Sequence, residues 1–171
     1  MKPFIGIKKI WYGDVFTEAV TKASLKTWLE SATQVKNSHQ DTWQYTEDDP
    51  TYTDYINELS GNIYYRDVTQ KGAKTITFTM GEYTFDDKID LQGGEKVDTD
   101  AGWAASDTPG IMNKGIVGQT KTGNYVVFTN AAVIAKGTMA EKNIGLGVTA
   151  VAMENPNDNV KSDYLFDGEK V

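Results

Sequence analysis

Alternation of apolar and polar residues is the main pattern in the second half of the chain. The run KTITFTM at 74–80 places isoleucine, phenylalanine and methionine on one side and threonines on the other. The runs YVVFTN at 125–130 and IGLGVTAVAM at 144–153 alternate in the same way. Because a period of two is typical of a strand with one buried side and one solvent-facing side, the pattern predicts strands in all three places.

Strand-forming composition predicts further extended segments along the chain. These lie at 4–12, 39–46, 62–68, 114–121, 132–136 and 163–166, and 103–108 is a loop or a short strand. A glycine-containing turn at 70–72 predicts that the 62–68 strand forms a hairpin with the strand that follows it.

Two short helices are predicted between these strands. Apolar residues at i, i+3, i+4 and i+7 begin at Leu25, and Ser24 can cap this first helix. Thr84 and Asp87 resemble a capping box, which predicts a second helix over Phe85 to Leu91 before a pair of glycines ends it.

The segment at 47–61, EDDPTYTDYINELSG, gives conflicting indications. Tyr52, Tyr55 and Leu59 have helical spacing, but the threonine and tyrosine content favours extended structure. We interpret the segment as a long excursion between strands, with room for a helical turn. Excursions of this length are uncommon in compact domains and usually serve a function.

The predicted fold class is mainly β. We expect two packed antiparallel sheets that form a β-sandwich or a partly closed barrel, with one or two short flanking helices. The length of 171 residues suits one domain over 1–171, and no repeat or linker divides it. Gly145 and Gly147 permit close approach, at an internal corner of the barrel or at a neighbouring subunit.

Composition narrows the possible functions. The chain has 24 acidic and 17 basic side chains, for a net charge of −7, which disfavours groove binding to nucleic acid. It has no cysteine, so disulfides and thiolate chemistry are absent. The N-terminus has no apolar run long enough for a signal peptide, and no segment is apolar enough to span a membrane, so we expect a soluble protein made in a cytoplasm.

Catalysis has few candidate residues. His39 is the only histidine, and in a strand it would share a side with Asp41 while Ser38 points away. Acidic clusters occur at 47–49, 86–90 and 98–100, but nothing in the sequence brings two carboxylates together as a glycosidase needs. We therefore predict no catalytic residue and a protein that is not an enzyme.

Metal and cofactor sites are also not predicted. The stretches DTDAGWAASD at 98–107 and NPNDNVKSD at 155–163 hold oxygen ligands suited to calcium, but neither has EF-hand spacing. Solvated turns explain these stretches better. A single histidine without cysteines disfavours zinc, and no glycine motif for phosphate binding is present.

Several segments together resemble the major tail tube proteins of long-tailed bacteriophages. They are IGIKKIWYGD followed by a short helix, DTWQYTEDDPTYTDY, KGAKTITFTMGEYTFDDKIDLQGG, and the closing GNYVVFTNAAVIAKGTMAEKNIGLGVTAVAMEN. The resemblance spans most of the chain, although no catalytic signature anchors it.

This resemblance implies a self-assembling structural protein of the virion tail, made in the host bacterial cytoplasm. Copies would form hexameric rings that stack into the tail tube, the conduit for genome delivery. The partners would be other copies of the chain, a tape measure protein and a tail terminator. DNA would pass through the lumen without specific binding, because an acidic surface repels phosphates.

In such tubes the N-terminal segment and a long inter-strand loop bridge neighbouring subunits or rings. The matching candidate interface residues here are Met1, Lys2, Pro3, Phe4, Asp48, Asp49, Tyr52 and Tyr55. Two other functions remain open from the residues alone. One is a carbohydrate- or surface-binding β-sandwich module with exposed aromatic rings, and the other is an enzyme of the glycosidase type.

Overall fold

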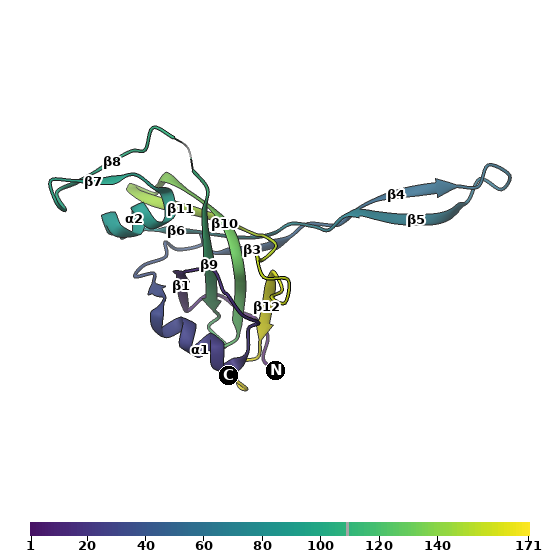
Figure 1. The fold of residues 1–171 in the computed structure, drawn as a ribbon, viewed down its shortest axis with the longest axis horizontal. Coiled ribbons are helices and arrows are strands. Elements are labelled where there is room, and N and C mark those ends of the chain that lie inside the picture. The colour runs from purple at the N-terminus through teal and green to yellow at the C-terminus, as the bar shows by residue number, and fades with distance from the viewer. Residues whose placement is uncertain (109) are drawn as a thin grey trace.

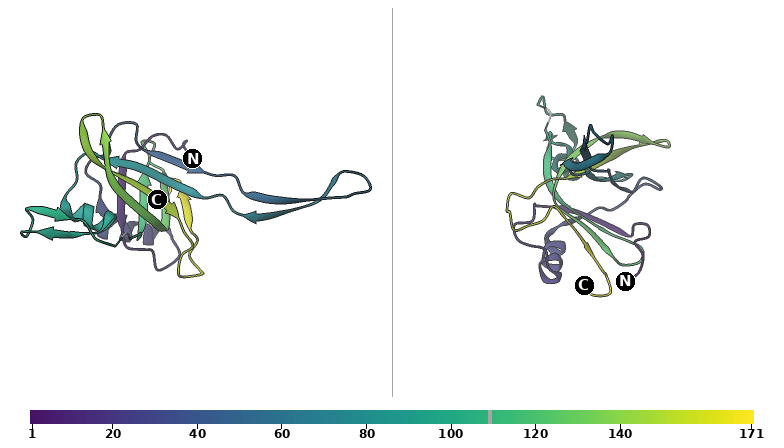
Figure 2. Two further views of the ribbon diagram at one scale, coloured as in Figure 1. Left: turned by 90° about the horizontal axis from the view of Figure 1, so that it is seen from above. Right: turned by 90° about the vertical axis from the view of Figure 1, so that its right-hand side faces the viewer.

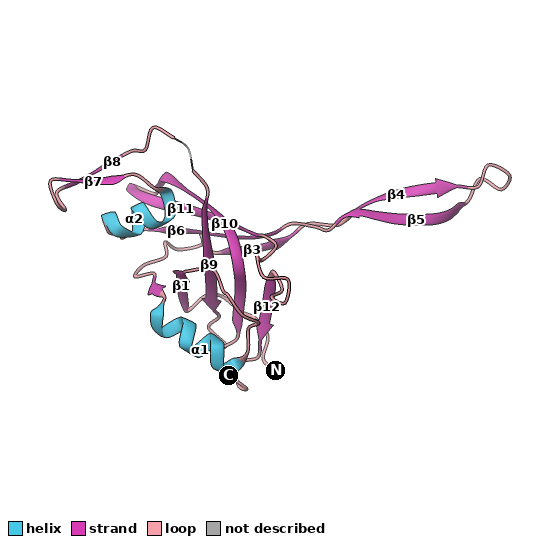
Figure 3. Ribbon diagram, in the orientation of Figure 1, coloured by secondary structure: helices cyan, strands magenta, loops and turns pink. Residues whose placement is uncertain are grey.

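The chain forms a mainly β structure with two short helices (Figure 3). The computed structural model describes residues 1–108 and 110–171. In chain order the elements are β1 (Lys9–Gly13), α1 (Lys22–Ser31), β2 (Thr33–Gln34), β3 (Gln44–Glu47), β4 (Thr51–Ile56), β5 (Ile63–Gln70), β6 (Lys74–Met80), α2 (Phe85–Gln92), β7 (Glu95–Val97), β8 (Gly102–Ala104), β9 (Met112–Gln119), β10 (Tyr125–Ala140), β11 (Asn143–Ala152) and β12 (Asp163–Phe166).

Most strands belong to one antiparallel sheet of eight strands. Its order is β2-β1-β9-β10-β11-β6-β3, and β12 pairs with β10 beside this path. The strands β4 and β5 form a separate two-stranded sheet, as do β7 and β8. Within the described residues the end strands β2 and β3 do not pair with each other, so the eight-stranded sheet is not a closed barrel.

The long strand β10 connects the two halves of this sheet. Its first part pairs with β12 and its second part with β11, while β9 follows the opposite side as far as Val133. A bulge between Phe128 and Ala131 separates the two parts. Bulges bend a strand and increase its twist. The strands predicted at 125–129 and 132–136 are both present, but the separation predicted between them is wrong, because they form one bent strand.

The main core lies inside this bent sheet. Ile76, Phe78 and Met80 of β6 are each at most 1% exposed, which confirms the alternation predicted for this strand. They form one cluster with buried side chains of β1, β9, β10 and β11 and with Leu91 of α2. The predicted close approach at Gly145 occurs within the chain, since a Cβ there would lie 2.8 Å from the Cγ2 atom of Thr79.

A second, smaller core lies beneath α1. Leu25 of this helix is fully buried against Val117 of β9 and Val127 of β10, on the side of the sheet opposite the main core. Ring stacking extends this packing, because the centroids of Phe16 and Trp28 are 4.6 Å apart. The helix thus covers one side of the β1-β9-β10 part of the sheet.

Both predicted helices are present, although the first begins differently. Thr21, not Ser24, caps α1, and the two side chains form a capping box in which each binds the other residue's backbone N–H. The capping box of Thr84 and Asp87 at α2 is confirmed. The predicted strand at 39–46 is wrong in its first half, where Asp41 has a φ of 59° in a turn.

The segment at 47–61 is mostly strand and not an irregular excursion, although the helical turn for which it had room occurs at 57–61, where the Gly61 N–H donates to the Asn57 carbonyl. Its centre is the strand β4, which pairs antiparallel with β5 along a hairpin that projects from the body (Figure 1). The strand predicted at 62–68 exists, but the hairpin predicted through 70–72 is wrong, because β5 pairs with β4 and not with β6. The smaller hairpin of β7 and β8 projects from the opposite end of the body (Figure 2).

Candidate assembly surface

The projecting hairpin, residues 48–73, is named the arm. Every side chain from Thr51 to Gln70 is exposed except that of Asp54, which is half-buried. In the described chain β4 and β5 pair only with each other, and no arm residue belongs to either core cluster. The arm is therefore folded through its own cross-strand contacts.

Cross-strand side-chain contacts add to the backbone pairing that holds the arm together. Arg66 donates from Nη2 to Oδ2 of Asp54 at 2.8 Å, and a second hydrogen bond from Nε makes the pair bidentate. The Arg66 guanidinium also lies 4.0 Å from the ring centroid of Tyr52, and the rings of Tyr55 and Tyr65 are 5.7 Å apart. The hydrogen bond from Arg66 lowers the pKa of the Asp54 carboxyl.

The arm exposes much apolar surface to solvent. Its large apolar side chains are Tyr52, Tyr55, Ile56, Leu59, Ile63, Tyr64, Tyr65 and Val68, each at least 44% exposed. If each offers about 200 Å² when free, they leave on the order of 1,000 Å² in water. That is about the area one partner buries in a standard protein interface and more than the usual apolar patch of a monomer.

The tip of the arm, residues 57–62, has a defined conformation. Asn57 accepts hydrogen bonds from the backbone N–H of Leu59 through its side chain and of Gly61 through its carbonyl, at 2.9 and 2.8 Å. Gly61 has a φ of 74°, a conformation that glycine adopts without strain. The result is a closed loop that presents Leu59, which is 98% exposed, at the far end of the arm.

The arm joins the body through a narrow root. Asp48 donates its N–H to the carbonyl of Ala73 at 2.9 Å, and a Cβ on Gly72 would lie 1.6 Å from the Asp48 carbonyl oxygen. Beside the root, Lys74 contacts Asp163 at 2.7 Å and Glu47 at 3.6 Å, and the hydrogen bond to Asp163 raises the pKa of the Lys74 ammonium. An open depression of about 760 Å³ lies between this root and the segment at 152–163.

The unpaired strand edges of the large sheet in the described residues include those of β3 and of the last part of β10. The strand β3 pairs with β6 on one side only. The pairing of β10 with β9 ends at Val133, so residues 134–140 pair only with β11. Unpaired edges are sites where a strand of another chain can add to a sheet.

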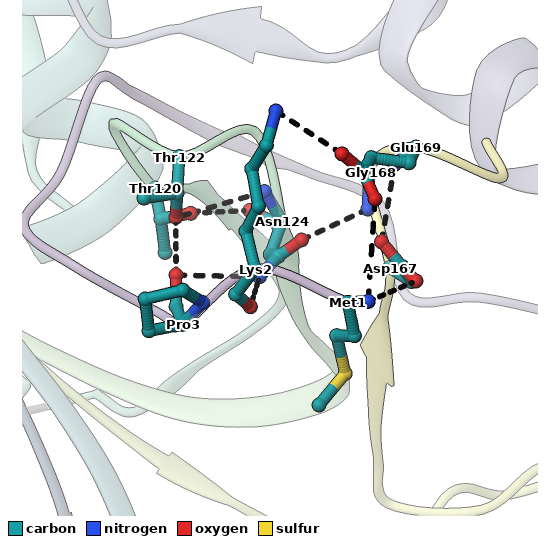
Figure 4. A network of polar contacts seen from close by, with 9 residues as sticks. All are labelled: Met1, Lys2, Pro3, Thr120, Thr122, Asn124, Asp167, Gly168 and Glu169. Carbon is teal, nitrogen blue, oxygen red and sulfur yellow. Dashed lines mark hydrogen bonds and ion pairs between the residues drawn. The ribbon is translucent and has the colours of Figure 1, made fainter.

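The N-terminal candidates Met1 to Phe4 lie against their own subunit (Figure 4). Asn124 holds both chain ends, because its Nδ2 donates to the Lys2 carbonyl at 2.6 Å and its Oδ1 accepts from the Gly168 N–H at 3.0 Å. The Lys2 ammonium pairs with Glu169 at 3.1 Å, and Phe4 packs against the main core.

The remaining interface candidates, Asp48, Asp49, Tyr52 and Tyr55, lie on the arm. Both aspartates are exposed near the root, and both tyrosines are on β4. In the part of the chain that the structure describes, no hydrogen bond or ion pair joins the arm to Met1–Phe4. The sequence prediction missed the β5 half of the arm, because the strand at 62–68 was assigned to the main sheet.

The residues considered for catalysis do not form a catalytic arrangement. His39 lies in a turn, where its backbone N–H donates to the Thr79 carbonyl at 2.7 Å. No hydrogen bond joins its side chain to Ser38 or Asp41 within residues 1–108 and 110–171. The two acids beside Lys74 at the arm root both contact its ammonium, which lies between them as a counter-ion.

The acidic segments considered for calcium are held by contacts within the chain. Lys96 bridges Asp86 and Asp100 at 2.7 and 2.6 Å, and these hydrogen bonds raise the pKa of Lys96 to about 12. Asn155 donates to the Phe16 carbonyl and anchors the later segment to the body. The described residues contain no group of three or more acidic or histidine side chains placed to hold a metal ion.

One buried polar contact had no clear sequence signature. The Tyr12 hydroxyl donates to Oδ1 of Asp87 at 2.6 Å and joins β1 to the start of α2. Burial, and then the hydrogen bond to Asp87, raise the pKa of the Tyr12 phenol. This contact joins two residues that are 75 positions apart in the sequence, and it contributes to the stability of the body.

No protein-family model matches the chain, and no curated protein matches it significantly. Among the described residues, no helix is long and apolar enough to cross a membrane.

Proposed function

We propose that this chain is a structural virion protein, the subunit of a phage tail tube, and not an enzyme. Copies would assemble into hexameric rings, and the rings would stack into the conduit for genome delivery. The observation that carries this proposal is the arm, an ordered hairpin with about 1,000 Å² of apolar surface in water. Such a surface is suited to association with other copies of the chain.

The large sheet supports the same proposal. The main core lies on one side of this sheet and the core beneath α1 on the other, which supports a sandwich-like subunit with α1 outside it. The free edges of β3 and of residues 134–140 would pair across neighbouring subunits and close a ring, because a heterologous contact repeated around an axis gives a closed ring. The net charge of −7 would let DNA pass without specific binding.

Deletion of the arm tests the proposal. Wild-type protein at high concentration is expected to form rings or tubes visible by negative-stain microscopy. A variant in which a short turn replaces residues 50–71 should remain a folded monomer, because no arm residue contributes to either core cluster. A wild-type protein that stays monomeric at every concentration and salt condition would refute the proposal.

One observation favours a second candidate function. Tyr52, Tyr55, Tyr64 and Tyr65 are all exposed on the arm, and exposed aromatic rings can form a platform for sugars. A carbohydrate- or surface-binding module would bind a glycan array as a monomer, and a variant without the arm would lose that binding. If the protein forms tubes and binds no glycan, the result supports the tail tube function over the carbohydrate-binding function.

A further inference from the structure

The arm carries apolar side chains on both of its faces. On one face Tyr52 lies opposite Val68, beside the Asp54–Arg66 pair. On the other face Tyr55 lies opposite Tyr65. Directly opposed residues of an antiparallel pair point to the same side, and neighbouring pairs point to opposite sides.

Both faces are open to solvent to a similar extent. Tyr52 and Val68 are 52% and 57% exposed, and Tyr55 and Tyr65 are 44% and 57% exposed. A hairpin that covers a single surface usually has one apolar and one polar face. The arm carries large exposed apolar side chains on both faces, although Thr53 and Asp67 accompany Tyr55 and Tyr65, so a partner on one side would leave the apolar side chains of the other face in water.

Charge favours another copy of the same chain as the partner. The arm, residues 48–73, has five carboxylates and two basic side chains. Residues 1–36, which form β1 and α1 in the body, have six lysines and three carboxylates. The acidic arm of one copy is therefore complementary to the basic N-terminal part of another, and such complementarity guides association between specific partners.

We propose that the arm is a wedge that two other copies of the chain cover, one on each face. A fully covered arm then involves three copies of the chain, namely the copy that carries the arm and one copy on each of its two faces. This inference rests on the proposed function, because it assigns the neighbours of the arm within the assembly. The cross-strand contacts of Arg66 hold the arm in its docking conformation before binding, which lowers the entropy lost when it docks.

Substitutions on one face at a time test the wedge. The double variants Tyr52→Thr/Val68→Thr and Tyr55→Thr/Tyr65→Thr keep strand-forming residues and alter opposite faces. Each should raise the critical concentration for tube formation about tenfold or more relative to wild type. If either double variant assembles like wild type, that face is not covered and the wedge is refuted.

Cross-linking provides a second test, which is read in assembled protein and does not rely on a loss of assembly. The chain has no cysteine, so Thr53→Cys and Val68→Cys each place a single thiol, on opposite faces of the arm. A thiol-linked benzophenone in assembled protein should cross-link to a different segment of a neighbouring copy from each face. Cross-links from one face alone, or to the same segment from both, would overturn the wedge. Wild-type protein that does not assemble would instead refute the proposed function.

Discussion

Replacing the leucine at the end of the arm should weaken assembly without changing the fold of the monomer. Leu59 is 98% exposed, so it contributes almost no burial energy to the isolated chain. Burying a leucine side chain against a neighbour stabilises a contact by about 2 kcal/mol. A difference of about 2 kcal/mol corresponds to about 30-fold in an association constant. Leu59→Ser should therefore raise the critical concentration about 30-fold, if each subunit is held by one tip contact.

Sedimentation measures this effect directly. The concentration left in the supernatant, after tubes are pelleted from a dilution series, gives the critical concentration of each variant. Leu165→Ser is a matched control, because Leu165 is a 59% exposed leucine of the body. Thermal unfolding below the critical concentration should give the same midpoint for Leu59→Ser and wild type. An unchanged critical concentration for Leu59→Ser, or an equal rise for Leu165→Ser, would refute a specific role of the tip.

Three further predictions concern the body and the arm root. Tyr12→Phe removes the donor to buried Asp87 and should lower the free energy of unfolding in urea by about 1.5–3 kcal/mol, whereas Tyr64→Phe on the arm should change it by less than about 0.5 kcal/mol. Because the pKa of Tyr12 is raised in the folded chain, stability should be intact below the ordinary tyrosine pKa of 10.0 and fall as pH rises above it. The urea midpoint of Tyr12→Phe should depend less on pH in that range, and an equally steep dependence would contradict the assignment. Gly72→Ala should open the arm root to limited proteolysis, since its Cβ would collide with a backbone oxygen, while Gly137→Ala, with open space at its Cβ, should resist like wild type.

The alternation of β6 and β11 made their strands predictable, because both have one face in the main core. The bend in β10 was not predictable in the same way. Thr129 and Asn130 interrupt its apolar pattern, which suggests a break between two strands. Both residues are buried, and they bind backbone groups of the segment at 153–162. Partners so distant in sequence leave no local pattern.

The arm shows what composition can and cannot predict. Threonine and tyrosine content favoured extended structure within 47–61, a strand was predicted at 62–68, and both segments contain strands. Composition could not indicate that they pair with each other outside the body. The adjacent Tyr64 and Tyr65, followed by Arg66, depart from strict alternation, and this departure was the available indication that β5 is not a core strand.

In the proposed assembly, stability and association would depend on separate residues. Side chains such as Phe78 and Leu146 are at most 1% exposed and stabilise the body, whereas the large apolar side chains of the arm are at least 44% exposed and take no part in the core clusters. Effects of substitutions at distant sites without shared partners are usually additive. Variants of the arm can therefore change the affinity between copies while the body keeps its free energy of unfolding. Because of this separation, a loss of assembly in an arm variant can be attributed to the lost contact between copies and not to misfolding of the body.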